Sequence, residues 1–221
     1  MSVTELNYSV KDSLGKAEKG TLVSKNVFLY DETGNMIEQQ SNAVLSNQIP
    51  STLRFKYDSK GNMIESEHFD EHGTAIFKSV NRYDHNGNIL TSKMYDRGSL
   101  RVDYSRIEYK YDKYEKIEEQ KSYNRNGLYE GRATYLYDKQ GNTIELKSYD
   151  ENDKFIYKQV TAYDAQGNSI KVIGYDPDGS VASIYTTEYV FDKQGNWVIK
   201  QLYKAGKPSS YLEREITYYR E

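Results

Sequence analysis

Short runs that alternate hydrophobic with polar residues fill most of the chain, and turn sequences separate them. Each run is about eight to ten residues long and rich in Tyr, Ile, Val and Thr, which is typical of β-strands. Apolar residues do not recur at the three- and four-residue intervals of an amphipathic helix. The pattern therefore predicts an all-β protein.

The turn sequences repeat one motif, Tyr-Asp-x-x-Gly-Asn, at intervals of about 27 residues, a period that indicates a repeat architecture. The copies begin at Tyr30, Tyr57, Tyr83, Tyr137, Tyr163 and, with Phe for Tyr, Phe191. A seventh, irregular copy begins at Tyr111 and has Glu115 and Lys116 in place of Gly-Asn. Residues 39–52 are the other departure from the pattern. We interpret both as structural drift within the repeat rather than as sites.

A second turn signal, an aromatic residue followed by Asp or Asn, lies near the middle of most repeats. Its copies are Phe69-Asp70, Tyr95-Asp96, Tyr123-Asn124, Tyr149-Asp150, Tyr175-Asp176 and the weaker Tyr203-Lys204. In Asp-x-x-Gly, the Asp side chain accepts a hydrogen bond from the backbone two residues on, and Gly supplies a positive φ. Both turn types therefore predict β-hairpins. Asp12 to Gly15 carries the same signal and indicates a half repeat at the N-terminus.

Two hairpin turns per repeat predict an antiparallel meander of about sixteen short strands in seven tandem hairpin repeats. We assign residues 1–29 to an N-terminal half repeat with edge strands, and residues 30–221 to one continuous domain. Because a twisted open sheet rarely exceeds about ten strands without curling, we expect a single curling or spiralling sheet.

Pairing across the turn at 138–142 predicts two different sheet faces. If Tyr137 pairs with Thr143 and Leu136 with Ile144, one face is thinly aliphatic, and the other mixes aromatic rings with charges. A membrane barrel needs a uniformly apolar face. The aliphatic face carries Lys56, Arg82 and Lys110, so we expect no membrane-spanning sheet.

Composition narrows the possible functions. The chain has 23 Tyr, no Cys and a net charge of −3, with 30 basic and 33 acidic residues. Tyr must supply much of the buried area, and the balance of charges lacks the basic footprint of a nucleic-acid-binding protein. No apolar run is long enough for a membrane helix, and Met1 to Tyr8 do not form a signal peptide. The expected location is the cytoplasm, or the cell surface or exterior if a leader has been removed.

The Tyr-Asp-x-x-Gly-Asn-x-Ile core resembles the YD repeat of the RHS family. The best matches run from Tyr57 to Ile64, from Tyr137 to Ile144 and from Tyr163 to Ile170. The resemblance implies a bacterial protein built of β-hairpins in a coiling sheet, with protein or carbohydrate partners. The chain departs from the large members because it is too short to enclose a shell around a toxin, and its period holds two turns.

Three groups of residues suggest chemistry but fit turn geometry better. His68, His72 and Asp70 have ligand chemistry for zinc, yet they straddle a hairpin turn. Asp176 to Gly179 begins like a calcium loop and lacks the later ligands, so we interpret it as a β-turn. Ser13 and Lys16 match a short acyl-enzyme motif that lies within a turn signal. We therefore predict no catalytic residue, no metal and no cofactor.

The sequence favours a non-enzymatic binding or scaffold protein. One alternative is a carbohydrate-binding module that uses exposed Tyr side chains and Trp197, the single Trp and the candidate ligand-binding residue. Another is an immunity or antitoxin protein for an RHS-type toxin. The sequence does not decide which face of the sheet is buried.

Overall fold

The structure is a computed structural model that describes residues 1–44, 50–96 and 103–218. It confirms an all-β antiparallel meander of sixteen strands. The strands are β1 (Ser2–Ser13), β2 (Lys16–Tyr30), β3 (Met36–Ala43), β4 (Ser51–Tyr57), β5 (Met63–Phe69), β6 (Ala75–Tyr83), β7 (Ile89–Asp96), β8 (Asp103–Tyr111), β9 (Ile117–Asn124), β10 (Tyr129–Tyr137), β11 (Thr143–Tyr149), β12 (Phe155–Tyr163), β13 (Ser169–Tyr175), β14 (Val181–Phe191), β15 (Trp197–Lys204) and β16 (Lys207–Thr217).

The hydrogen-bonded order of the strands is that of a closed barrel. Strand β1 pairs with β2 on one side and with the last strand, β16, on the other, from Ser2 opposite Thr217 to Tyr8 opposite Tyr211. The expectation of an open, curling or spiralling sheet is therefore wrong. Closure is the physical alternative to curling, because it pairs the backbone groups that two free edges would leave exposed.

The chain divides into two compact units, which we describe separately. The first contains residues 1–57, 66–76 and 185–221, and the second contains residues 58–65 and 77–184. This division does not test the assignment of residues 30–221 to one domain, which remains a prediction. The irregular stretch at 39–52 lies in the first unit, and its residues 45–49 fall outside the described part. On either side of them, β3 and β4 pair as a hairpin, from Glu38 opposite Arg54 to Ser41 opposite Ser51.

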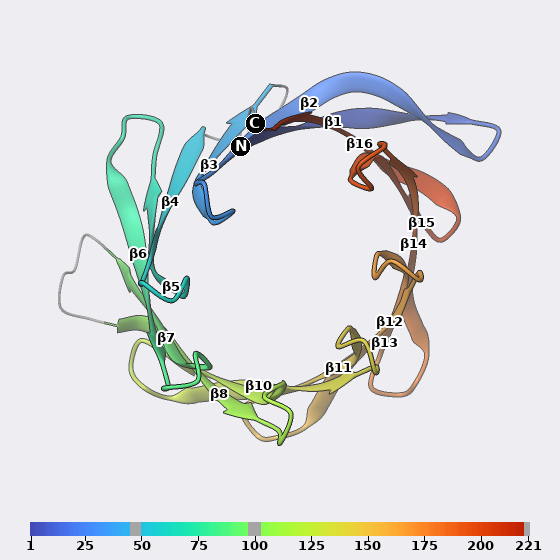
Figure 1. Ribbon diagram of the computed structural model, residues 1–221. Coiled ribbons are helices and arrows are strands. Elements are labelled where there is room, and N and C mark those ends of the chain that lie inside the picture. Colours follow the sequence, from blue (N-terminus) through green and yellow to red (C-terminus); the bar gives the residue numbers. More distant parts are fainter. Residues whose placement is uncertain (45–49, 97–102, 219–221) are drawn as a thin grey trace. The chain divides into compact units, whose positions relative to one another are not determined.

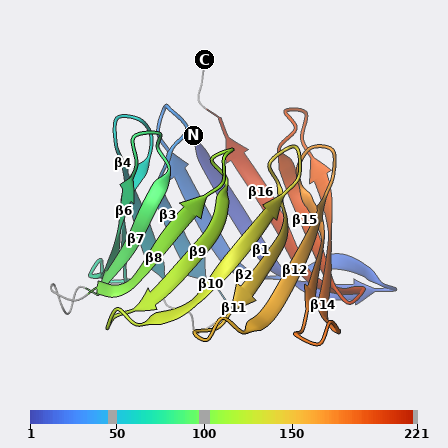
Figure 2. The ribbon, with the colours of Figure 1, turned by 90° about the horizontal axis from the view of Figure 1, so that it is seen from below.

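In the first unit, the β1–β2 hairpin continues past the end of the β1–β16 pairing (Figures 1 and 2). Its extension packs against β15 and β16. Ala17 is buried, and its carbonyl oxygen accepts a hydrogen bond of 2.7 Å from Nε2 of Gln201. Nζ of Lys19 lies 2.5 Å from a carboxylate oxygen of Glu213. These contacts join β2 to β15 and β16, in addition to the backbone ladder between β1 and β16.

In the second unit, β8 to β12 form consecutive antiparallel pairs, and Figure 2 shows β8, β9 and β10 side by side. Across the turn at 138–142, Tyr137 pairs with Thr143 as predicted, but Leu136 pairs with Glu145. A β-bulge at Ile144 causes this difference, since it inserts one residue on one strand. The predicted faces are therefore wrong beyond the turn: Leu136 shares a face with Glu145, and Tyr135 shares a face with Leu146.

Few hydrophobic side chains are buried in the described part of the chain. They are Val3, Ala17, Ala75 and Tyr203, and no large side chain is completely buried. Most aromatic rings are partly buried, and so the sheet is stabilised mainly by its backbone ladder and by contacts among half-buried side chains. Such contacts recur at fixed positions of the repeat. A repeat that lacks one of them therefore differs visibly from its neighbours.

Candidate functional site

The Tyr that begins the turn motif has a structural role in five of the copies. Its phenol donates a hydrogen bond to the carbonyl oxygen at the bulge of the preceding repeat. The pairs are Tyr57 with Met36 (2.7 Å), Tyr83 with Met63 (2.6 Å), Tyr111 with Ile89 (2.7 Å), Tyr137 with Ile117 (3.0 Å) and Tyr163 with Thr143 (2.9 Å). The bond gives a partner to a carbonyl beside the displaced ladder. Burial raises the pKa of Tyr111 to about 12 and also raises the pKa of Tyr137.

In three consecutive repeats, the aromatic residue near the middle of the repeat lies under a cation from the neighbouring strand. Arg106 covers Tyr123 at 4.3 Å from the ring centroid, Arg132 covers Tyr149 at 3.9 Å and Lys158 covers Tyr175 at 4.5 Å. Sequence reasoning missed these pairs. The signal was present, because each of these cations precedes its aromatic partner by the same interval and recurs with the repeat.

Acidic partners complete this second set of contacts. Arg132 Nε lies 2.9 Å from Asp153 Oδ1, and Arg132 Nη1 lies 3.3 Å from Glu119. Hydrogen bonds from Arg132, and then from Tyr129, hold the pKa of Asp153 below its ordinary value. These charges neutralise one another within the sheet, so we assign them to stability rather than to ligand binding.

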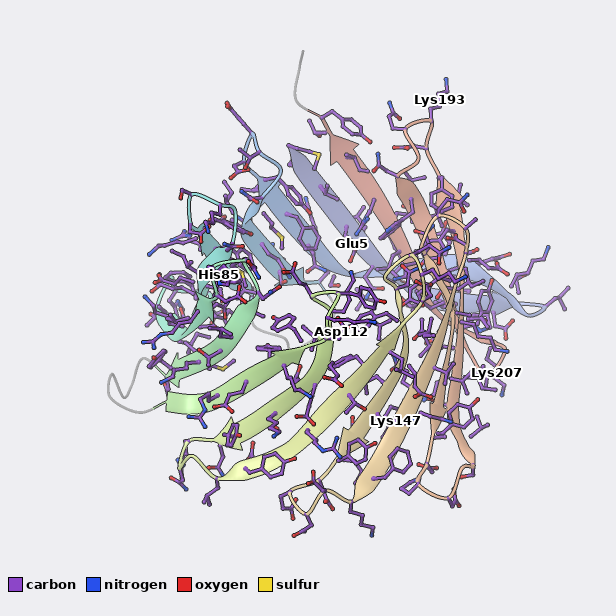
Figure 3. The ribbon with its side chains drawn as sticks, turned by 60° about the horizontal axis from the view of Figure 1, so that its bottom comes forward. Glu5, His85, Asp112, Lys147, Lys193 and Lys207 are labelled. Carbon is purple, nitrogen blue, oxygen red and sulfur yellow. The ribbon has the colours of Figure 1, made fainter. Side chains whose placement is uncertain are left out.

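A groove of about 820 Å³ opens beside the irregular turn at 112–116 in the second unit. It is lined by Asp112, Tyr114, Lys116 and Glu118 and by residues 135–141. We call it the Tyr114 groove. Its volume lies within the range of about 300–1,000 Å³ that is usual for small-molecule sites. Figure 3 labels Asp112 at the turn between β8 and β9.

The irregular turn keeps the backbone of the regular ones. The amide of Asp112 donates to the carbonyl of Lys116 (2.8 Å), and the amide of Glu115 donates to the carbonyl of Asp112 (3.1 Å). In the regular turn, Asp138 makes the same two bonds with Asn142 and Gly141. Glu115 occupies the position of Gly141 with a φ of 60°. The backbone of the turn is therefore preserved and only its side chains differ, and the interpretation of the irregular copy as structural drift remains a prediction.

Side-chain bonding at the irregular turn differs from that of its neighbours. In the regular turn, Asn142 Nδ2 donates to Asp138 Oδ2 at 2.8 Å, and the same contact occurs in the turns that begin at Asp31, Asp58, Asp84 and Asp164. Lys116 replaces this Asn. Oδ1 of Asp112 still accepts the amides of Tyr114 (2.8 Å) and Lys116 (3.0 Å). Its Oδ2 has no hydrogen-bond donor among the residues that the structure describes.

Two other side chains of the irregular turn are available to a ligand. Tyr114 is 71% exposed, and Lys113 Nζ lies 4.8 Å from the centroid of its ring. Lys116 reaches towards the next turn, where its Nζ would lie 2.9 Å from a Cβ added to Gly141. Within the described chain, no carboxylate forms an ion pair with Lys116. One ring, one carboxylate oxygen and one ammonium group therefore converge on a single groove.

A smaller hollow of about 380 Å³ lies beside the Tyr114 groove and shares Lys116 and Tyr137 with it. Its wall contains Asn81, which is buried and donates from Nδ2 to the carbonyl oxygen of Met63 at 2.8 Å. The phenols of Tyr83, Tyr111 and Tyr137 in this wall also donate to backbone carbonyls. Lys116 therefore stands at the junction of two hollows, of which the larger contains Asp112 and Tyr114.

Trp197, the candidate ligand-binding residue from the sequence, belongs to the first unit, whereas the residues of the Tyr114 groove belong to the second. It pairs with Phe191 across its turn and is half-buried. The Arg214 guanidinium covers its ring at 3.5 Å, and the ring of Tyr189 lies 6.3 Å away. One face of the indole is thus occupied by a side chain of the protein itself. Its role in ligand binding remains a prediction.

The remaining candidate motifs are turns. Asp70 accepts the amides of His72 (2.9 Å) and Thr74 (2.8 Å), and Gly179 donates to the carbonyl of Asp176 at 2.9 Å. Ser13 and Lys16 flank the two-residue loop that joins β1 to β2. In the described ranges, no group of three His, Cys, Asp or Glu residues could hold a metal ion. The same ranges contain no helix that is long and apolar enough to cross a membrane.

Comparison with known proteins assigns the chain to a family. Residues 17–136, just over half of the chain, match the model of a family described as "Uncharacterised protein". The chain belongs to this family. The matched residues include the irregular turn and end at Leu136, within the Tyr114 groove. A comparison with curated proteins finds no match.

Solved structures support the fold. A porin-like protein from Bacteroides uniformis is similar with a TM-score of 0.61 and 12% identity, over 98% of this chain and 96% of that one. At this identity the likeness concerns the fold alone. The complex TcdB2-TccC3 matches 95% of this chain and 13% of its own, with 17% identity and a TM-score of 0.34.

Proposed function

We propose that the chain is a non-enzymatic binding protein that holds a saccharide in the Tyr114 groove. The observation that carries the proposal is the coincidence of an exposed Tyr114 ring with the unsatisfied Oδ2 of Asp112. The apolar face of a sugar stacks on an aromatic ring, while its hydroxyls need hydrogen-bond acceptors close by. The irregular turn provides both, whereas the neighbouring turns use the equivalent atoms for their own structure.

Binding, rather than hydrolysis, is proposed because the other acids of the groove are engaged. Asp138 accepts three hydrogen bonds within its own turn, from Gln140 and from the amide and side chain of Asn142. Glu118 forms an ion pair of 2.9 Å with Lys110. Glycoside hydrolysis requires a pair of carboxyl groups, one acid and one base or nucleophile. Asp112 is the one acid of the groove that has neither an ion pair nor hydrogen bonds to both carboxylate oxygens among the described residues.

We further propose that the hairpins are related to the YD repeats of the RHS family. Support comes from the six regular motifs and from the shared use of their Tyr phenols across adjacent repeats. This relationship concerns ancestry and adds nothing to the saccharide proposal, which rests on the irregular turn alone.

Affinity gel electrophoresis against a panel of soluble neutral and acidic polysaccharides tests the function. Wild-type protein is expected to be retarded by at least one of them, and Tyr114→Ala to migrate freely. Gln166→Ala is the matched control, because Gln166 has the same position in the regular turn at 164–168 and should leave the retardation unchanged. Free migration of the wild type on the whole panel, or equal retardation of Tyr114→Ala, would contradict the proposal.

A further inference from the structure

We propose that the Tyr114 groove selects an acidic saccharide, with Lys116 binding the carboxylate of a uronic-acid unit. This inference rests on the proposed function and adds the class of ligand. Three groups determine it: the ring of Tyr114, Oδ2 of Asp112 and Nζ of Lys116. The first two suit any sugar, and the third distinguishes an acidic sugar from a neutral one.

Lys116 is placed to bind an anion that the protein does not supply. In the regular turns an Asn amide at this position bonds to the Asp of the same turn, as Asn142 does to Asp138. The Lys116 side chain points to the neighbouring turn instead, near Gly141, where the absence of a side chain leaves room for its ammonium group. A substituent at that position would displace it. The Tyr137 ring, 6.0 Å away, provides a weak cation–π contact.

The lining holds three carboxylates and two lysines, and none of the three carboxylates forms an ion pair with Lys116 among the described residues. Asp138 is directed into its own turn by three hydrogen bonds, and Glu118 is paired with Lys110. Lys139 also lines the groove and adds positive charge. Asp112 and Glu118 each keep one carboxylate oxygen free of hydrogen bonds, but Glu118 is paired with Lys110, whereas Asp112 forms no ion pair among the described residues. A ligand that offers a carboxylate to Lys116 and hydroxyls to Asp112 satisfies both.

Polygalacturonate and its fully methyl-esterified form are the matched probes, because they share a backbone and differ in charge. In isothermal titration at low ionic strength, wild-type protein is expected to bind the acidic polymer about three- to fivefold more tightly per site, the range of an exposed ion pair. This preference should shrink in 0.5 M NaCl, since salt screens exposed charges. Lys116→Gln should abolish the preference and retain binding to the esterified polymer.

Lys193→Gln is the control, because Lys193 is a lysine of the regular turn at 192–196, outside the groove residues (Figure 3). It should keep the wild-type preference. An equal loss of preference in Lys193→Gln and Lys116→Gln would overturn the inference, as would a preference that survives in Lys116→Gln. If the wild type binds both polymers equally and Tyr114→Ala binds neither, the result supports saccharide binding and contradicts the preference for acidic saccharides. If the wild type binds neither polymer, the preference for acidic saccharides is contradicted, and the polysaccharide panel tests the proposed function separately.

Discussion

The turns at 112–116 and 138–142 have the same backbone hydrogen bonds but differ in their side-chain bonds. The regular turn bonds both oxygens of its Asp within the turn, and the irregular turn bonds one. In the regular turn, Gly141 adopts a φ of 90° without strain, and Asn142 secures both oxygens of Asp138. In the irregular turn, Glu115 adopts a φ of 60° at a cost, and Lys116 leaves Oδ2 of Asp112 unsatisfied. A residue other than Gly in this conformation costs about 1–2 kcal/mol. Under the proposed function, the irregular turn gives up stability and gains polar groups for a ligand.

The largest expected effect comes from placing a branched side chain in the regular turn. Gly141→Val should lower the free energy of unfolding by about 1–3 kcal/mol, because Val is strained at a positive φ. Urea denaturation measures the change. Gln140→Val is the control in the same turn, where φ is not positive, and should have little effect. Equal destabilisation by both variants would show that burial of the added side chain, and not backbone strain, determines the outcome.

Converting the irregular turn to the regular sequence should separate stability from binding. The double variant Glu115→Gly, Lys116→Asn relieves the strained φ and restores an amide donor for Oδ2 of Asp112. We expect the free energy of unfolding to rise by about 1 kcal/mol and saccharide binding to weaken. Urea denaturation measures the change in stability, and affinity electrophoresis measures the change in binding. A variant that is less stable than the wild type, or one that binds as well, would contradict the comparison.

Stability at alkaline pH should test the half-buried Tyr phenols that lie at, or two residues before, the start of the turn motifs. Burial raises the pKa of Tyr111 to about 12 and the pKa values of Tyr83, Tyr109, Tyr135 and Tyr137 above their ordinary value of 10.0. A raised folded pKa gives stability that is complete below pH 10 and is lost as the pH rises to about 12. Thermal melts across this range should show falling stability, and Tyr111→Phe should lessen the slope. A stability independent of pH up to 12 would contradict the account.

The smallest expected effect concerns Asp138 itself. The hydrogen bond from Asn142 is the main cause that holds its pKa below the ordinary value of 3.8. Asn142→Ala should therefore raise the pKa of Asp138 towards 3.8, as followed by the ¹³C shift of its carboxyl group. Lowered folded pKa values confer stability above the ordinary pKa that is lost as the pH falls, so the variant should also lose less stability in acid. An unchanged pKa of the Asp138 carboxyl group would mean that the hydrogen bonds from the backbone amides alone hold it below the ordinary value.

The sequence was informative wherever a residue is needed by local geometry. The Asp and Gly of the turn motifs predicted the hairpins, and the period predicted the number of strands, because both depend on contacts within about five residues. Closure depends on the pairing of β1 with β16, for which no local pattern exists. The bulge at Ile144 also escaped prediction, and so did the hydrogen bond beside it, in which the Thr143 carbonyl accepts the phenol of Tyr163 from the next repeat.

The candidate site shows the same limit. The sequence marked the turn at 112–116 as irregular, but Glu115 and Lys116 alone suggested structural drift. The preserved backbone bonds show that the turn is intact, and Oδ2 of Asp112 and Nζ of Lys116 have no hydrogen-bond or ion-pair partner among the described residues. Trp197 was conspicuous as the single Trp, yet Arg214 on the adjacent strand β16 covers its ring, a side-chain contact that the turn motifs do not predict.

The most direct test is to map the bound saccharide onto the chain by NMR. Amide shifts of the ¹⁵N-labelled protein are followed while a short oligogalacturonate is added. The account predicts that the perturbed amides cluster in residues 112–118 and 135–141, which line the Tyr114 groove, and leave the regular turn at 192–196 unchanged. Perturbations centred on Trp197, or spread evenly over the turns, would contradict it.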